Sequence, residues 1–125
     1  SSELAFVEEV KGIVGEELIV NVPSDGSVWL YGADGMNTME REFYDSPSAE
    51  YDLFKKSLCN IASNQDVANA VHTTNARYVL LLDETVNVGT FDEKEWEGIL
   101  SITDDTPGFK MVLSNGAMRL YEIVD

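Results

Sequence analysis

The strongest constraint on the fold is a continuous apolar run, Tyr78 to Leu82, that lies between Arg77 and Asp83. A strand without polar alternation buries both of its faces, which is typical of a strand inside a sheet that helices cover. The run is far shorter than the about 18 apolar residues that a membrane-spanning helix needs. We therefore expect a sheet with a buried central strand and helices packed on its faces.

Helical and strand patterns alternate in the first half of the chain. Apolar residues at three- and four-residue spacings predict an N-terminal helix that Gly15 ends. Ser46 or Ser48, with Pro47 between them, opens the longest predicted helix. The elements predicted here are a helix over residues 4–14, a strand over 17–22, a short helix over 27–34, a strand over 36–44, and the long helix up to residue 61.

The second half of the chain ends in a predicted hairpin. Asp92 is followed three residues later by Glu95, a capping box that marks the start of a helix. Asn115-Gly116 is the strongest short-range hairpin signal in the sequence. The elements predicted here are a helix over 65–73, the central strand over 77–82, a helix over 92–102, and hairpin strands over 109–113 and 117–124. Helices that alternate with strands predict one α/β domain over residues 1–125, with a mixed sheet flanked by helices and a C-terminal β-hairpin.

The charge of the chain excludes several kinds of partner. Eight basic residues stand against twenty-three acidic ones, which gives a formal net charge of −15. Affinity for a nucleic acid comes from Lys and Arg side chains that displace counterions from phosphates, so we expect no nucleic-acid binding. Adsorption to an anionic membrane through a basic patch is disfavoured for the same reason. The acidity indicates a well-solvated surface, with cation binding by clustered carboxylates as the alternative.

No segment of the sequence has the length and apolarity of a membrane span. The first residues also lack the pattern of a secretory signal peptide, a basic region followed by an apolar one. We therefore expect a soluble segment that does not itself insert into a membrane. The chain can still be a piece of something larger.

No catalytic or metal-binding pattern accompanies this fold. A calcium loop counted from Asp83 would need glycine at position six and glutamate at position twelve, where the sequence has Val88 and Lys94. Cys59 is the only cysteine, so a disulfide within the chain and a cysteine-based zinc site are excluded, and we expect a buried, inert thiol. His72 is the only histidine and is expected to end a helix. We predict no catalytic residue, no metal site and no cofactor.

One segment has the composition of a contact surface. A polar elbow, residues 24–27, follows the first strand, and the aromatic residues Trp29 and Tyr31 come directly after it. The carboxyl ends of strands are where open α/β sheets bind ligands. Aromatic faces beside Asp25 and Asp34 suit a sugar, through stacking and hydrogen bonds to hydroxyls. We predict Asp25, Trp29, Tyr31 and Asp34 as ligand-contact residues; in the alternative, Trp29 and Tyr31 pack into the core.

Four stretches of sequence carry a resemblance to known proteins. The first stretch, residues 21–31, reads Asn-Val-Pro-Ser-Asp-Gly-Ser-Val-Trp-Leu-Tyr, and the second is the nearby Asp34-Gly35. The third begins with residues 67–71 and leads into residues 76–83, and these last eight residues read Ala-Arg-Tyr-Val-Leu-Leu-Leu-Asp. The fourth is Leu120-Tyr121-Glu122-Ile123. In these the chain resembles the C-terminal extracytoplasmic domain of uncharacterised bacterial, mostly actinobacterial, polytopic membrane proteins. Those proteins in turn resemble glycosyltransferases of the GT-C class, which use lipid-linked sugar donors.

The resemblance implies a non-catalytic domain on the outer face of the cytoplasmic membrane. The catalytic carboxylates of GT-C enzymes lie in loops between membrane helices, so no catalytic residue is carried over to this chain. The implied partners are the membrane-embedded portion of its own parent chain and an acceptor glycan, with the domain contacting the glycan or covering the active site. The alternatives are a stand-alone soluble interaction module without a membrane parent, and a small hydrolase or transferase that would use His72.

Overall fold

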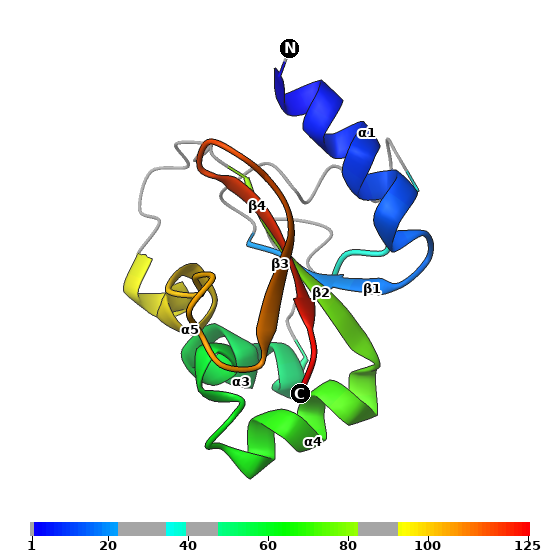
Figure 1. Ribbon diagram of the computed structural model, residues 1–125. Helices are drawn as coiled ribbons and strands as arrows, with labels where there is room; N and C mark the ends of the chain where they lie inside the picture. Colours follow the sequence, from blue (N-terminus) through cyan, green and yellow to red (C-terminus); the bar gives the residue numbers. More distant parts are fainter. Residues whose placement is uncertain (1, 23–34, 40–47, 83–92) are drawn as a thin grey trace.

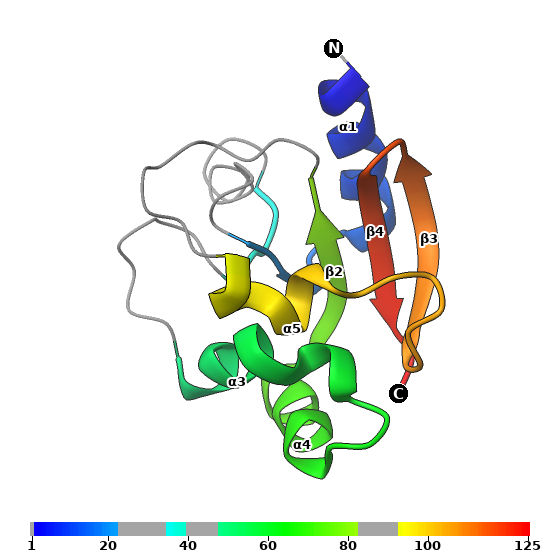
Figure 2. The ribbon, with the colours of Figure 1, turned by 90° about the vertical axis from the view of Figure 1, so that its left-hand side faces the viewer.

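In the described part of the chain, a mixed β-sheet separates the N-terminal helix on its first face from α-helices and 3₁₀ turns on its second face (Figures 1 and 2). The computed structural model describes residues 2–22, 35–39, 48–82 and 93–125. Within these residues the sheet has four strands in the order β1-β2-β4-β3. The strands are β1 (Leu18–Val20), β2 (Ala76–Leu81), β3 (Phe109–Asn115) and β4 (Met118–Ile123). This arrangement confirms the predicted α/β domain with a mixed sheet and a C-terminal hairpin.

The predicted central strand is the interior strand β2. It pairs in parallel with β1 and antiparallel with β4, so both of its edges are hydrogen-bonded. Val79 and Leu81 point into one cluster of buried residues, and Leu80 points into the other. The apolar run is continuous because both faces of β2 are covered, as the sequence pattern predicts.

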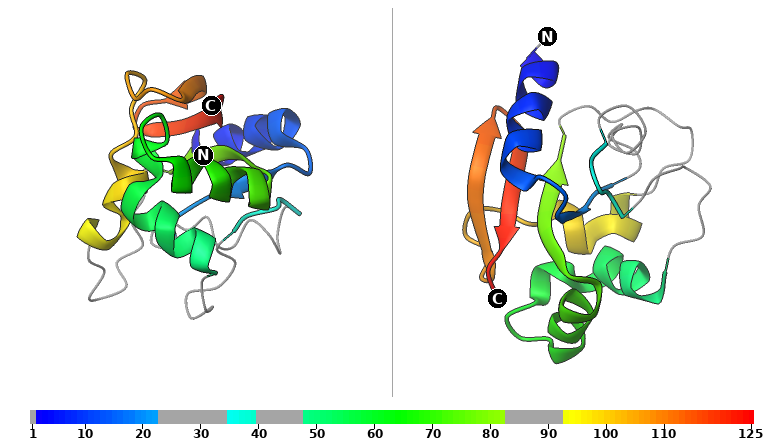
Figure 3. Two further views of the ribbon diagram at one scale, coloured as in Figure 1. Left: turned by 90° about the horizontal axis from the view of Figure 1, so that it is seen from below. Right: turned by 90° about the vertical axis from the view of Figure 1, so that its right-hand side faces the viewer.

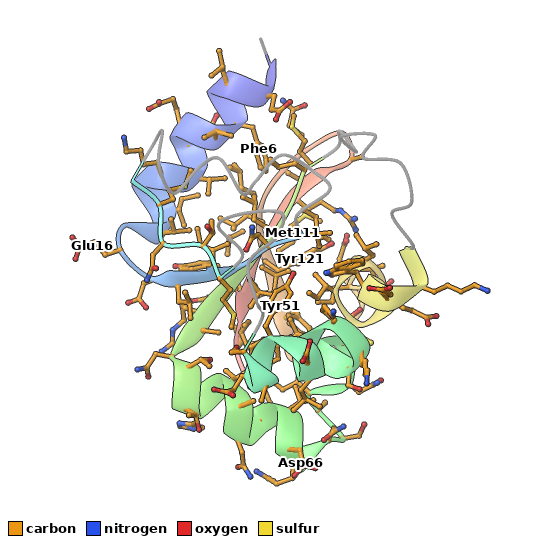
Figure 4. All side chains as sticks on the ribbon, turned by 180° about the vertical axis from the view of Figure 1, so that it is seen from behind. Phe6, Glu16, Tyr51, Asp66, Met111 and Tyr121 are labelled. Carbon is orange, nitrogen blue, oxygen red and sulfur yellow. The ribbon has the colours of Figure 1, made fainter. Side chains whose placement is uncertain are left out.

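The two clusters of buried residues lie on opposite faces of the sheet. The α1 cluster holds Phe6, Val7, Val10 and Val14 of α1 (Ser2–Val14) against apolar residues of β1, β2 and β4. The α3 cluster holds residues of α3 (Ala49–Ser57), α4 (Gln65–Thr74) and α5 (Glu97–Leu100) against the other face. Phe6 and Tyr51, labelled in Figure 4, belong to the α1 and the α3 cluster respectively. The two views in Figure 3 show α1 apart from the other helices.

Polar caps fix where the helices of the second face begin. The Ser48 hydroxyl oxygen accepts a hydrogen bond from the Tyr51 amide at 3.1 Å, so Ser48, of the two predicted candidates, caps α3. The α3 helix ends at Ser57 and a 3₁₀ turn (Leu58–Asn60) follows it. The Asn64 side-chain oxygen accepts from the Asp66 and Val67 amides, which starts α4.

The prediction of one continuous helix over residues 92–102 is wrong. The structure has a 3₁₀ helix η4 (Glu93–Trp96) and then a single α-helical turn, α5. The change occurs at Trp96, whose indole donates a hydrogen bond to the Tyr51 hydroxyl on α3. Gly98 then lies against the α3 backbone. Tertiary contacts with α3 therefore determine the backbone conformation of this segment. The predicted cap residue, Asp92, lies outside the described residues.

Two strand predictions are also changed in their bounds. The hairpin is confirmed, but its turn lies at Gly116-Ala117 because Asn115 pairs with Met118. Gly116 has a φ of 63°, which a residue without a side chain adopts without strain. The strand predicted over 36–44 is a single parallel bridge between Thr38 and Ile19 in its described part. Residues 40–44 and the short helix predicted over 27–34 lie outside the described residues.

Candidate functional site

The carboxyl edge of the sheet is where the sequence predicts a ligand. Asp25, Trp29, Tyr31 and Asp34 themselves lie outside the described residues. The strands β1 and β2 run in parallel, so their carboxyl ends reach the same edge. The bridge at Thr38 is parallel to β1 as well. β1, β2 and the segment around Thr38 thus run toward the same edge, and the carboxyl ends of parallel strands are where open α/β sheets position ligand-binding loops.

A chain of hydrogen bonds ties this edge to the helices. The Tyr51 hydroxyl on α3 donates to the backbone oxygen of Asn21, just beyond β1, at 2.6 Å. The same hydroxyl accepts from the indole nitrogen of Trp96 at 3.2 Å. Asn21 and Tyr51 are buried and Trp96 is half-buried. One buried hydroxyl therefore connects β1, α3 and η4, three elements far apart in sequence.

A lysine side chain lies beside this chain of hydrogen bonds. The Lys55 ammonium sits over the Trp96 ring, 5.0 Å from the ring centroid. It is also 3.5 Å from a carboxylate oxygen of Asp52, one helical turn before it. A cation over an indole face is attracted by the quadrupole of the ring. We call Tyr51, Asp52, Lys55 and Trp96 the α3–η4 cluster; its chemistry combines an aromatic surface with a positive charge.

Replacement of Tyr51 by Phe is expected to destabilise the domain by about 1–2 kcal/mol, because the Asn21 carbonyl and the Trp96 indole each lose a buried hydrogen-bond partner. Urea unfolding, followed by far-UV circular dichroism, measures the change. Tyr78→Phe is the matched control, because no protein hydrogen bond to the Tyr78 hydroxyl is found among the described residues. Equal stability of the two variants would contradict a bridging role for Tyr51.

A hollow lies at the opposite edge of the sheet, beside the amino end of β1. It has a volume of about 470 Å³ and is lined by Val14, Glu16, Glu17, Leu18, Asn37, Thr74 and Asn75. The Asn37 side-chain nitrogen donates to the backbone oxygen of Glu16 at 3.3 Å, while the Glu16 side chain points outward (Figure 4). Two exposed carboxylates and amide groups line this hollow, without an aromatic residue.

The side chains that metal or nucleophile chemistry would use include Cys59, His72 and the carboxylates. Over residues 2–22, 35–39, 48–82 and 93–125, no three His, Cys, Asp or Glu side chains gather as metal ligands would. Cys59 is partly buried against the α3 cluster rather than fully buried. His72 is exposed in the last turn of α4. Most of the calcium loop counted from Asp83 lies outside the described residues.

Sequence reasoning missed the α3–η4 cluster. Tyr51 belongs to the α3 cluster of buried residues, and Trp96 packs against it. The hydrogen bond between them joins residues 45 positions apart, a separation at which no sequence spacing rule applies. The only available signal was chemical, because buried Tyr and Trp side chains usually find a partner for their polar atoms.

Comparison with known proteins identifies a family and a shared fold. The model of a family of unknown function, DUF6541, matches residues 1–125, and the chain belongs to this family. The C-terminal globular domain of an oligosaccharyltransferase from Archaeoglobus fulgidus has a similar structure, with a TM-score of 0.61 at 11% sequence identity. The similarity covers 97% of this chain and 95% of that domain. No curated protein matches the sequence.

In the part of the chain that the structure describes, no helix is long and apolar enough to span a bilayer.

Proposed function

We propose that this DUF6541 chain is a non-catalytic, extracytoplasmic domain of a bacterial, glycosyltransferase-like membrane protein. The observation that carries the proposal is the fold: nearly the whole chain matches nearly the whole C-terminal globular domain of an oligosaccharyltransferase. At 11% sequence identity the similarity concerns the fold alone, and one fold can serve many functions. The proposed function therefore rests on the kind of protein in which this fold occurs, an oligosaccharyltransferase. The domain's partner is then the membrane-embedded portion of its own chain.

The carboxyl edge of the sheet is the part of the domain that we assign to contact with an acceptor glycan, or to covering the membrane active site. The parallel ends of β1 and β2 lead to the segments that follow Val22 and Leu82. Asp25, Trp29, Tyr31 and Asp34 follow the first of these ends and are the proposed contact residues. The hydrogen bonds of the Tyr51 hydroxyl join the adjoining described edge to α3 and η4.

The reading frame of the full gene tests the membrane context. We expect it to encode several segments of about 20 apolar residues before Ser1, each long enough to cross a bilayer. A frame without such segments would contradict the proposal and leave the alternative, a stand-alone protein-interaction module. Deletion of residues 1–125 from the full-length product is then expected to abolish or strongly reduce sugar transfer while leaving membrane insertion intact.

Removal of an aromatic side chain from the proposed contact segment tests the glycan assignment. Trp29→Ala and Tyr31→Ala are each expected to weaken binding of an acceptor glycan by about tenfold, since an aromatic surface at a binding site contributes 1–2 kcal/mol or more. Isothermal titration calorimetry with candidate oligosaccharides measures the loss. Full retention of affinity in both variants, with the fold intact by circular dichroism, would contradict their assignment as contact residues, whereas loss of the fold in both would indicate that they pack into the core.

A further inference from the structure

The environment of Lys55 is unusual for a chain of this charge. The domain carries a net charge of −15, yet the Lys55 side chain is only 16% exposed. Its carboxylate partner, Asp52, is 53% exposed and stands 3.5 Å away. Charge-assisted hydrogen bonds between an ammonium and a carboxylate are shorter, about 2.7–2.9 Å. An ammonium has three donor hydrogens, so a loose contact to one carboxylate leaves it able to bind an anion.

The indole that Lys55 contacts is held in a fixed orientation. The Trp96 nitrogen donates to Tyr51, and Tyr51 donates in turn to the Asn21 backbone beyond β1. The position of the ring is therefore set by the sheet as well as by its own helix. A binding surface that is already ordered loses less conformational entropy when a ligand arrives. The Trp96 side of the cluster is thus pre-organised by its hydrogen-bond link to the end of β1.

We propose that the α3–η4 cluster binds a sugar that carries a negative charge, either a uronic acid or a sugar phosphate. Lys55 pairs with the carboxylate or phosphate, and the half-buried Trp96 provides apolar contact to the sugar ring. The inference rests on the proposed function, because a domain that meets a glycan needs a surface that distinguishes glycans. A neutral sugar makes no use of the ammonium, whereas an acidic one replaces the loose contact with Asp52.

Titration calorimetry on the 125-residue chain tests this inference. The probes are a tetrasaccharide that alternates glucuronic acid with N-acetylglucosamine, glucose 1-phosphate, and the neutral tetramer of N-acetylglucosamine. We expect at least one acidic probe to bind about tenfold more tightly than the neutral tetramer, the difference that one partly desolvated charge pair supplies. The carboxylate and phosphate probes show which of the two charged groups the site prefers.

Variants of the cluster separate binding from folding. Lys55→Met retains the aliphatic stem and is expected to lose the preference for the acidic probe. Asp52→Asn removes the competing carboxylate and is expected to tighten binding severalfold, a gain that a purely structural ion pair would not give. Lys110→Met, at an exposed position of β3, is the matched control and should change affinity less than twofold. Thermal unfolding of each variant verifies its fold.

The inference is overturned if Lys55→Met binds the acidic probe as the wild type does, if neutral and acidic probes bind equally, or if none of the probes binds. These results leave the proposed function standing, because that proposal is decided by the upstream reading frame and by sugar transfer in the full-length product.

Discussion

Gly98→Ala is expected to destabilise the domain by about 3 kcal/mol and to lower its melting temperature by roughly 10 °C. A Cβ atom at this position would lie 2.7 Å from the carbonyl oxygen of Lys56 and even closer to the Ser57 amide nitrogen. These are backbone atoms, so no side-chain rotation relieves the overlap. The α3 and α5 helices would have to separate, which would open the α3 cluster beneath them.

A glycine in an open position provides the control for this effect. Gly12 lies in α1, and a Cβ atom added there meets no atom within 4 Å. Gly12→Ala is expected to stabilise the domain by about 0.5–1 kcal/mol, through helix propensity. Thermal unfolding by differential scanning calorimetry compares the two variants. If Gly98→Ala were as stable as the wild type, the close approach of α5 to α3 would be wrong.

Phe54→Ala is expected to cost about 3–5 kcal/mol, because it removes a ring from the centre of the α3 cluster and leaves a cavity. Phe54 is fully buried and belongs to the cluster that joins α3, α4 and α5 to the sheet. Guanidinium unfolding measures the loss. Leu4→Ala is the control: Leu4 is 66% exposed on α1, and we expect a change within about 0.5 kcal/mol. Similar losses for the two variants would contradict the described core.

The elements that carry their own local signals were predictable from the sequence. The run from Tyr78 to Leu82 has no polar alternation, and the corresponding strand β2 is buried on both faces. Gly15, with a φ of 56°, ends the first helix as predicted. The hairpin was found from Asn115-Gly116, although its turn forms one residue later. Each of these features depends on neighbours within a few residues.

The features that depend on distant neighbours were not predictable. The helix predicted over 92–102 divides at Trp96, because its indole bonds to Tyr51 and Gly98 contacts α3. The α3–η4 cluster depends on the same contact between Trp96 and Tyr51, which are 45 residues apart in the sequence. The predicted contact residues Asp25, Trp29, Tyr31 and Asp34 remain predictions.

A measurement of which side of the cytoplasmic membrane the domain occupies tests the proposed function most directly. His72 is exposed on α4, and Cys59 is the only cysteine of the chain. In the full-length gene product, with its other accessible cysteines replaced, Cys59→Ala is combined with His72→Cys, and intact cells are treated with a membrane-impermeant maleimide. We expect the product to remain with the membrane fraction and to be labelled without lysis. Labelling only after lysis, or recovery of the product in the soluble fraction, would contradict an extracytoplasmic domain of a membrane glycosyltransferase.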